Sequence, residues 1–155
     1  MLNIDIITVG KIKSPWVKEG VEYYRKLVGK YADLTLIQVK EANNAPMKPE
    51  KAMLIEGENI LDQLDDTAYS IALDVSGDSL SSEQLSRLLE NKKRDYSRIQ
   101  FVIGGAYGLD AAVKKGTNTS LSLSKMTFPH ELTEVILLEQ LFRALSISAG
   151  SKYHK

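Results

Sequence analysis

The stretch FVIGGAYGLD, residues 101–110, has the residue types of a ligand-binding loop. An apolar run rich in β-formers ends at Gly104 and Gly105, and Gly108 follows just before a predicted helix. Glycine allows a sharp turn or a close approach of main chain, and open α/β sheets bind ligands beyond the carboxyl ends of their strands. The spacing G-G-x-x-G matches neither the dinucleotide pattern nor a P-loop. A phosphate-containing ligand is therefore poorly supported for this loop. The alternative is that the glycines only allow a sharp turn and that the loop binds no ligand.

The two histidines are candidates for proton transfer near pH 7. His130 follows Pro129 at a predicted helix start, where a structural or capping role is expected. His154 lies in the tail SKYHK, residues 151–155, and such a chain end is ordinarily disordered. The sequence contains no cysteine, which excludes disulfides and cysteine-based metal sites. We expect no bound metal.

Charge is balanced overall but uneven along the chain. The 155 residues include 20 Lys and Arg against 20 Asp and Glu. This balance counts against a free-standing nucleic-acid binder, because phosphate affinity comes chiefly from cationic side chains. Residues 11–30 and 87–98 carry a positive excess, and residues 48–66 carry a negative one. Each run is a solvated helix face unless folding brings the positive runs onto one surface.

Strand and helix patterns alternate along the chain and predict an α/β fold. Expected strands are 2–9, 34–39, 69–75, 99–103 and 121–125, with a turn at 76–78. Expected helices begin at Pro15 after an N-cap Ser14, after the loop 40–51 and at the capping box 81–84. Two more are expected to cover 109–115 and 131–148. The alternation predicts a single domain, residues 1–155, with a mainly parallel sheet and helices on both faces. Without a membrane-length apolar run or a leader pattern, we expect a cytoplasmic protein with no membrane partner.

The last predicted helix, 131–148, carries apolar residues around most of its circumference. An ordinary surface helix shows a single apolar stripe, so this helix needs cover on two sides. One side can be the sheet, and we expect the other to be a second copy of the chain across a two-fold axis. The alternative is a helix buried wholly within its own fold.

Several stretches in order along the chain resemble one protein family. They are YSIALDVSG (69–77), VIGGAYGL (102–109), LSLSKMTFPHE (121–131), LLEQLFRA (137–144) and the terminal YHK (153–155). In this order and spacing the chain is similar to the ribosomal RNA large-subunit methyltransferase H family, the smallest members of the SPOUT methyltransferases. The resemblance implies a deep trefoil knot near the C-terminus, which is an exception to the rule against knots. It also implies a homodimer that binds S-adenosyl-L-methionine in the knot.

The resemblance also places the cofactor. It would lie against the end of the third strand, the glycine loop and the loop after the fifth strand: Leu73, Gly104, Gly105, Leu123, Ser124, Lys125, Met126, Thr127 and Phe128. S-adenosyl-L-methionine carries no phosphate, which suits a glycine loop that lacks the lysine of a P-loop.

The reaction implied by the resemblance is methylation of N3 of a pseudouridine in the intersubunit hairpin of large-subunit ribosomal RNA. We expect assembled ribosomes to be the substrate. His154 would handle the proton or position the substrate, Tyr153 would pack beside the base, and Arg143 would face substrate phosphate or base. In such dimers, the tail of one subunit is expected to fold over the cofactor of the other. For Arg143 the alternative is an i, i+4 pair with Glu139.

Two departures from the family pattern leave the tail geometry open: Phe142 where Tyr is frequent, and Lys152 where Pro is frequent. Two other functional classes stay open on the residues alone. One is a nucleotide-binding regulatory domain that uses FVIGGAYGL as an anion loop. The other is a ribosome-associated binding protein without catalysis.

Overall fold

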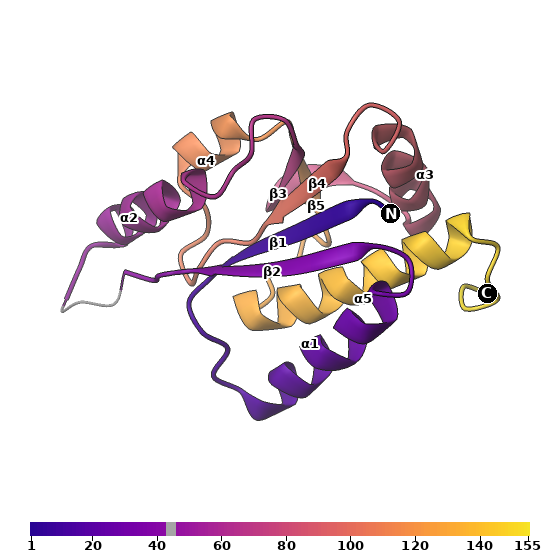
Figure 1. The fold of residues 1–155 in the computed structure, drawn as a ribbon. Helices are drawn as coiled ribbons and strands as arrows, with labels where there is room; N and C mark the ends of the chain where they lie inside the picture. Colours follow the sequence, from indigo (N-terminus) through magenta and orange to yellow (C-terminus); the bar gives the residue numbers. More distant parts are fainter. Residues whose placement is uncertain (43–45) are drawn as a thin grey trace.

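The computed structural model describes residues 1–42 and 46–155. Residues 43–45 belong to the predicted loop 40–51 and lie outside the described residues. The chain forms one five-stranded sheet with helices packed on it (Figure 1).

The sheet has the strand order β2-β1-β4-β3-β5, and each neighbouring pair is parallel. This confirms the predicted parallel sheet. The strands are β1 (Asn3–Val9), β2 (Asp33–Val39), β3 (Tyr69–Ser79), β4 (Arg98–Val102) and β5 (Thr119–Ser122).

Helices cover both faces of the sheet, as the alternating pattern predicts (Figure 1). Alternate residues of β1 show why: Ile4 and Ile6 join one buried apolar cluster, whereas Ile7 and Val9 join another. The first cluster is completed by α1, α3 and α5, and the second by α2 and α4. The helices are α1 (Pro15–Val28), α2 (Pro49–Leu61), α3 (Ser82–Lys92), α4 (Ala111–Gly116) and α5 (His130–Ser148).

The sequence signals for helix starts are found at the N-termini of α3 and α1, where they are clearest. The Ser81 hydroxyl accepts a hydrogen bond from the Gln84 N–H, and the Gln84 side chain accepts one from the Ser81 N–H, so the capping box is confirmed. Ser14 occupies the N-cap position of α1 and Pro15 follows it, although the Ser14 side chain makes no capping hydrogen bond.

The predicted turn at residues 76–78 is wrong. Strand β3 continues to Ser79, and its register with β5 breaks between Leu73 and Asp78, both of which lie opposite Leu121. Gly77 makes this possible, because a Cβ there would lie 2.7 Å from the main-chain carbon of Ser120. Pairing with β5 therefore overrides the local turn signal.

Two boundaries near the glycine loop also differ from expectation. Strand β5 ends at Ser122, so residues 123–128 form a connecting loop. Helix α4 begins at Ala111 and not at residue 109, because Asp110 caps it by accepting a hydrogen bond from the Ala112 N–H at 3.2 Å.

Helix α5 lies against the sheet between α1 and α3 (Figure 1). Contacts within the chain bury Leu137, Leu138, Leu141, Phe142 and Ala144. The chain's own fold therefore covers one part of the helix, and the helix is not buried wholly within it. Five apolar side chains stay half-buried: Leu132, Val135, Ile136, Leu145 and Ile147.

Candidate functional site

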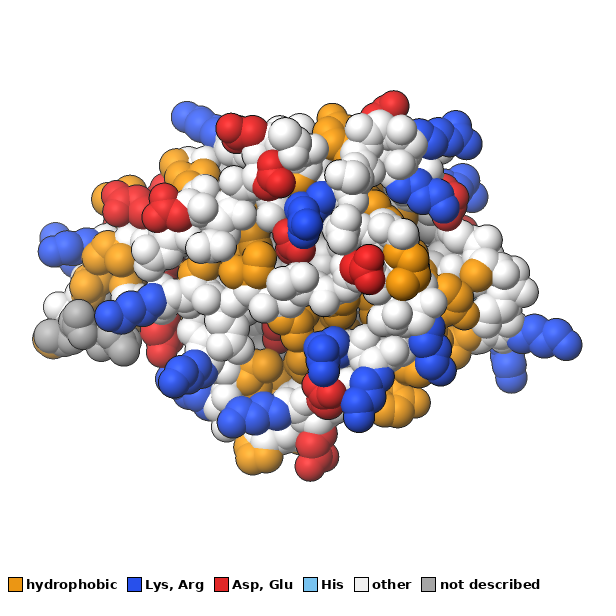
Figure 2. Space-filling view, viewed as in Figure 1, with side chains coloured by type: hydrophobic (Ala, Val, Ile, Leu, Met, Phe, Trp, Pro, Cys, Tyr) orange, Lys and Arg blue, Asp and Glu red, His pale blue; other side chains and the backbone are white. Residues whose placement is uncertain are grey.

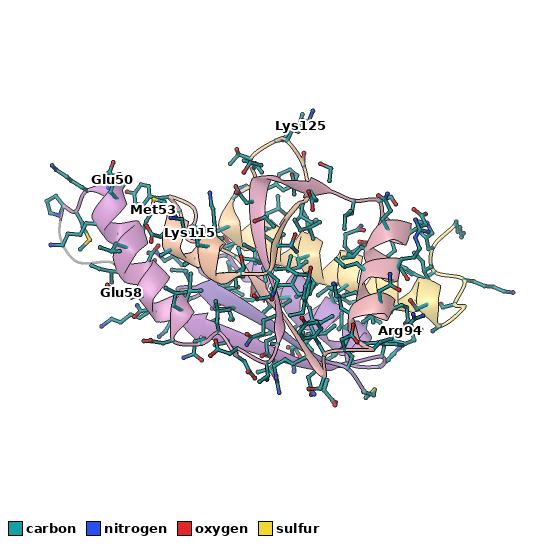
Figure 3. All side chains as sticks on the ribbon, turned by 90° about the horizontal axis from the view of Figure 1, so that it is seen from above. Glu50, Met53, Glu58, Arg94, Lys115 and Lys125 are labelled. Carbon is teal, nitrogen blue, oxygen red and sulfur yellow. The ribbon has the colours of Figure 1, made fainter. Side chains whose placement is uncertain are left out.

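A cavity of about 810 Å³ opens beside residues 73–75 of β3 and at the carboxyl ends of β4 and β5. Its volume lies in the range of ligand pockets, which is roughly 300–1,000 Å³. Of the nine residues predicted to contact a cofactor, Lys125 does not line it, and its exposed side chain projects from the tip of its loop (Figure 3). The other eight do: Leu73, Gly104, Gly105, Leu123, Ser124, Met126, Thr127 and Phe128. Three segments far apart in the sequence therefore meet at one concave site.

The glycine loop is tightly packed against its surroundings. A Cβ at Gly104 would lie 2.7 Å from the main-chain carbon of Gly108, and one at Gly105 would lie 2.7 Å from Oε1 of Glu56. Gly108 has φ +89°, a conformation that side chains rarely adopt. Residues 104 and 105 must therefore be glycine, because the packing around the loop leaves no room for a Cβ at either position.

Two buried carboxyl groups stand behind this loop, and neither was singled out from the sequence. Glu56 of α2 accepts a hydrogen bond from the Ala42 N–H, while its Oε1 has no partner among the described residues. Burial raises the pKa of Glu56, and repulsion from Glu41 adds to the rise. Glu134 of α5 is 3% exposed, and burial raises its pKa to about 7.

The cavity wall includes one ion pair. Nζ of Lys114 on α4 lies 3.2 Å from Oδ2 of Asp74, the residue after Leu73 on β3. Both side chains line the cavity, as does His130 at the first position of α5. Most of the remaining lining is apolar side chain or glycine main chain. The pair was missed because 40 positions separate its partners, and no local pattern indicates that the two side chains meet, although Asp74 lies in the stretch 69–77.

The predicted catalytic residues Arg143, Tyr153 and His154 meet in a second cluster, beside α5 and the start of α3. The Arg143 guanidinium donates to Nδ1 of His154 at 3.1 Å, and its Cζ lies 4.8 Å from the centre of the Tyr153 ring. Since arginine can only donate, Nδ1 of His154 accepts and Nε2–H donates to Glu83. The expected pair of Arg143 with Glu139 is present as well.

Glu139 organises this cluster. It accepts hydrogen bonds from Nε of Arg143 at 2.8 Å and from the Tyr153 hydroxyl at 3.4 Å. The bond to Glu139 raises the pKa of Arg143, and burial is the main cause of the raised pKa of Tyr153. Phe142, the departure from the family pattern, stacks edge-on against Tyr153 with ring centres 4.6 Å apart. The tail is therefore folded against its own chain. The i, i+4 spacing of Glu139 and Arg143 was the sequence signal that could have indicated the part that Glu139 plays in this cluster.

The tail cluster and the cavity lie at different ends of α5. Thr133 lines the cavity, whereas Arg143 is ten positions further along the helix. At a rise of 1.5 Å per residue the separation is about 15 Å. Figure 1 shows the C-terminus at the opposite end of the molecule from α2 and α4. The sequence pointed to both groups of residues, but within one chain the fold does not bring them together.

The positive runs do not form one patch on the face shown in Figure 2. Lysine and arginine side chains are scattered there among acidic and apolar ones. Arg25 and Lys93 are also engaged, with Glu22 at 2.9 Å and Glu90 at 2.8 Å. Exposed pairs of this kind contribute little to stability, but they lower the charge available to a phosphate backbone.

The described part of the chain contains neither a membrane span nor a metal-binding cluster. Among its helices, none combines the length and the apolar character of a transmembrane segment. Across residues 1–42 and 46–155, no group of three or more His, Asp or Glu side chains is placed to hold a metal ion.

Comparison with known proteins identifies the family. The model of a family described as "Predicted SPOUT methyltransferase" matches residues 2–154. Three similar proteins are each named "Ribosomal RNA large subunit methyltransferase H". They come from Clostridium botulinum (strain Eklund 17B / Type B), Bifidobacterium animalis subsp. lactis (strain AD011) and C. botulinum (strain Langeland / NCTC 10281 / Type F), at 43%, 43% and 45% identity. Each match covers 99% of this chain and 100% of the relative.

These matches span both the cavity and the tail. The chain therefore belongs to the SPOUT methyltransferases, in the family of the ribosomal RNA large subunit methyltransferase H.

Proposed function

We propose that this protein uses S-adenosyl-L-methionine to methylate N3 of a pseudouridine in the intersubunit hairpin of large-subunit ribosomal RNA. The proposed substrate is the assembled ribosome in the cytoplasm, and one domain of residues 1–155 carries the activity. The observation that carries the proposal is the meeting of eight expected cofactor contacts at one cavity. Family membership over nearly the whole chain supports the same reaction class.

The cavity fits the proposed cofactor in size and chemistry. Its apolar walls suit an adenine ring, and the main chain of residues 123–128 offers amides and carbonyls to the adenine edge. Gly104 and Gly105 allow close approach without a phosphate-binding lysine. The cofactor supplies an electrophilic methyl group on a positively charged sulfur.

The residues of the chain have two tasks in this reaction. The cavity residues would hold the cofactor and orient it toward the base, because alignment of nucleophile, methyl and leaving sulfur governs such a displacement. His154 handles the N3 proton or positions the base, Tyr153 packs beside the base, and Arg143 faces substrate phosphate or base. In the free chain Nδ1 of His154 is held by Arg143 and Nε2 by Glu83. Since Nδ1 carries the lone pair, substrate must displace the Arg143 contact before His154 can accept a proton.

The active enzyme is proposed to be a homodimer. Reacting atoms must come within about 3–3.5 Å, but the cavity and tail of one chain lie about 15 Å apart along α5. A second copy that presents its tail to the first cavity would complete the site. The half-buried side chains of Leu132, Ile136 and Ile147 leave α5 with apolar surface for such a contact.

A trefoil knot is part of the proposal. Leu121 lies opposite both Leu73 and Asp78, and Gly77 packs on the main chain of Ser120. Residues 73–78 therefore curve closely around β5, as expected if the last segment threads through a loop of the chain.

The decisive experiment compares ribosomal RNA from cells with and without the gene. Mass spectrometry should find the methylated pseudouridine only when the gene is present, and the purified protein should restore it on ribosomes that lack it. The same methylated nucleotide in both strains would overturn the proposal in favour of a non-catalytic ribosome-binding protein. Tight binding of ATP or NAD without S-adenosyl-L-methionine would instead favour a regulatory nucleotide-binding domain.

A further inference from the structure

The ion pair of Asp74 and Lys114 is the one pair of opposite charges among the described residues of the cavity wall. Asp74 is held in place: its Oδ2 accepts from the Ser76 hydroxyl at 2.7 Å and lies 3.2 Å from Nζ of Lys114. The Ser76 hydrogen bond is the main cause that lowers the pKa of Asp74, and Lys114 adds to it. The carboxylate is thus fixed and ionised where it faces the cavity.

Both partners retain unused capacity for a ligand. Oδ1 of Asp74 has only a long contact, 3.5 Å, to the Ser76 N–H. A lysine ammonium carries three N–H donors, and the Lys114 side chain is 41% exposed beside the open cavity. Because the ammonium partner of this pair is solvent-exposed, the pair contributes little to stability, and the fold does not depend on it staying closed.

We infer that Asp74 and Lys114 form the subsite for the zwitterionic amino-acid end of the cofactor, with Asp74 taking the ammonium and Lys114 the carboxylate. This inference rests on the proposed function and names which part of S-adenosyl-L-methionine these two residues recognise. A zwitterion inserted into an ion pair gives every charge an opposite neighbour, so no unpaired charge is left in the cavity. The rest of the cavity wall is mostly apolar, and its residues would contact the adenine and the sulfur.

The test uses two compounds that differ in the amino-acid end. S-adenosylhomocysteine has it, whereas methylthioadenosine keeps adenine, ribose and sulfur but lacks the amino and carboxyl groups. Isothermal titration calorimetry of both compounds is carried out on the full chain and on Lys114→Met and Asp74→Asn. Each variant should weaken S-adenosylhomocysteine by about tenfold or more, the usual cost of losing a charge-assisted bond, and leave methylthioadenosine within about twofold.

Matched variants separate recognition from folding. Lys115→Met removes the neighbouring exposed lysine, which does not line the cavity, and should leave both affinities unchanged (Figure 3). Lys114→Arg keeps the charge and should retain most of the affinity for S-adenosylhomocysteine. Thermal unfolding of every variant checks that the fold is intact.

Two results would overturn the inference while the proposed function stands. Equal weakening of both compounds in Lys114→Met would mean that the pair only fastens α4 to β3. Unchanged affinity for S-adenosylhomocysteine would mean that its amino-acid end lies elsewhere. If the unaltered protein binds neither compound nor S-adenosyl-L-methionine, the proposed cofactor itself is wrong, and the subsite is lost with it.

Discussion

Glu134 offers a stability test whose size can be worked out from the structure. The residue is 3% exposed, and burial and repulsion from Glu131 raise its pKa from 4.5 to about 7. Its carboxyl group borders a cavity of about 10 Å³ behind Gly104, which Lys11, His130 and Glu131 also line. A carboxyl group with such a pKa costs roughly 3 kcal/mol of folding free energy once it is ionised.

The sign follows from the two protonation states. Folded protein keeps the proton up to about pH 7, whereas the unfolded chain loses it near pH 4.5. The unfolded state therefore binds fewer protons between these values, and stability falls as pH rises through that range. Glu134→Gln keeps the shape and cannot ionise. Between pH 5 and 8 the unaltered protein should lose roughly 2–3 kcal/mol more unfolding free energy than this variant does.

The assay is urea unfolding followed by circular dichroism, at one protein concentration across the pH series. Glu131→Gln is a second test and not an independent control, because the Glu131 charge also raises the pKa of Glu134. For Glu131 itself the sign is opposite, because a hydrogen bond from the Lys13 N–H lowers its pKa. Stability from that bond is present above the unfolded pKa and is lost as pH falls. If the profiles of Glu134→Gln and the unaltered protein run parallel within about 0.5 kcal/mol, the assigned burial of this carboxyl group is wrong.

Three further predictions concern function. Gly104→Ala places a Cβ 2.7 Å from the Gly108 main chain, so it should cost about 1–3 kcal/mol of stability and weaken S-adenosyl-L-methionine binding. In Gly20→Ala the added Cβ meets only Val135, at 3.4 Å, so this control should change neither property. Urea unfolding and calorimetry measure both variants. His154→Ala, or removal of the last four residues, should abolish methylation of ribosomes while most cofactor affinity remains, and full activity after truncation would contradict the tail assignment. The chain has net charge +0, so we expect its affinity for bare RNA to be weak and salt-dependent. The rate of methylation of the naked hairpin should therefore fall well below that of ribosomes. Equal rates would argue against recognition of the assembled particle.

Much of the fold was predictable because its signals are local. The capping box at Ser81 and Gln84 and the first-turn Pro15 mark helix starts within a few residues. Apolar runs give five strands separated by helical segments, and that alternation is enough for a parallel sheet with helices on both faces. The turn predicted at residues 76–78 failed because its local signal competes with pairing to a strand more than 40 positions away.

The candidate site was only partly predictable for the same reason. The contacts of Leu73, the glycine loop and residues 123–128 were expected from resemblance alone, since no pattern in one segment says which others lie beside it. No sequence pattern indicated that Asp74 and Lys114 would form an ion pair. No pattern indicated that the Glu56 carboxyl group would pack against Gly105 either. Opposite charges far apart in sequence become a pair only when β3 and α4 are packed together.

The sequence by itself determined the order and type of the elements, the absence of a phosphate-binding lysine and the family. Each is set by residue types within short windows or by their order along the chain. Only the tertiary structure decided that the middle of β3 and the ends of β4 and β5 border one cavity, and that the tail lies on its own α5, away from that cavity. His154 and Glu83 meet across 71 positions, and such contacts depend on the packing of whole elements. That packing separates cavity and tail in one chain, which is the physical reason for our proposal that a second copy brings them together.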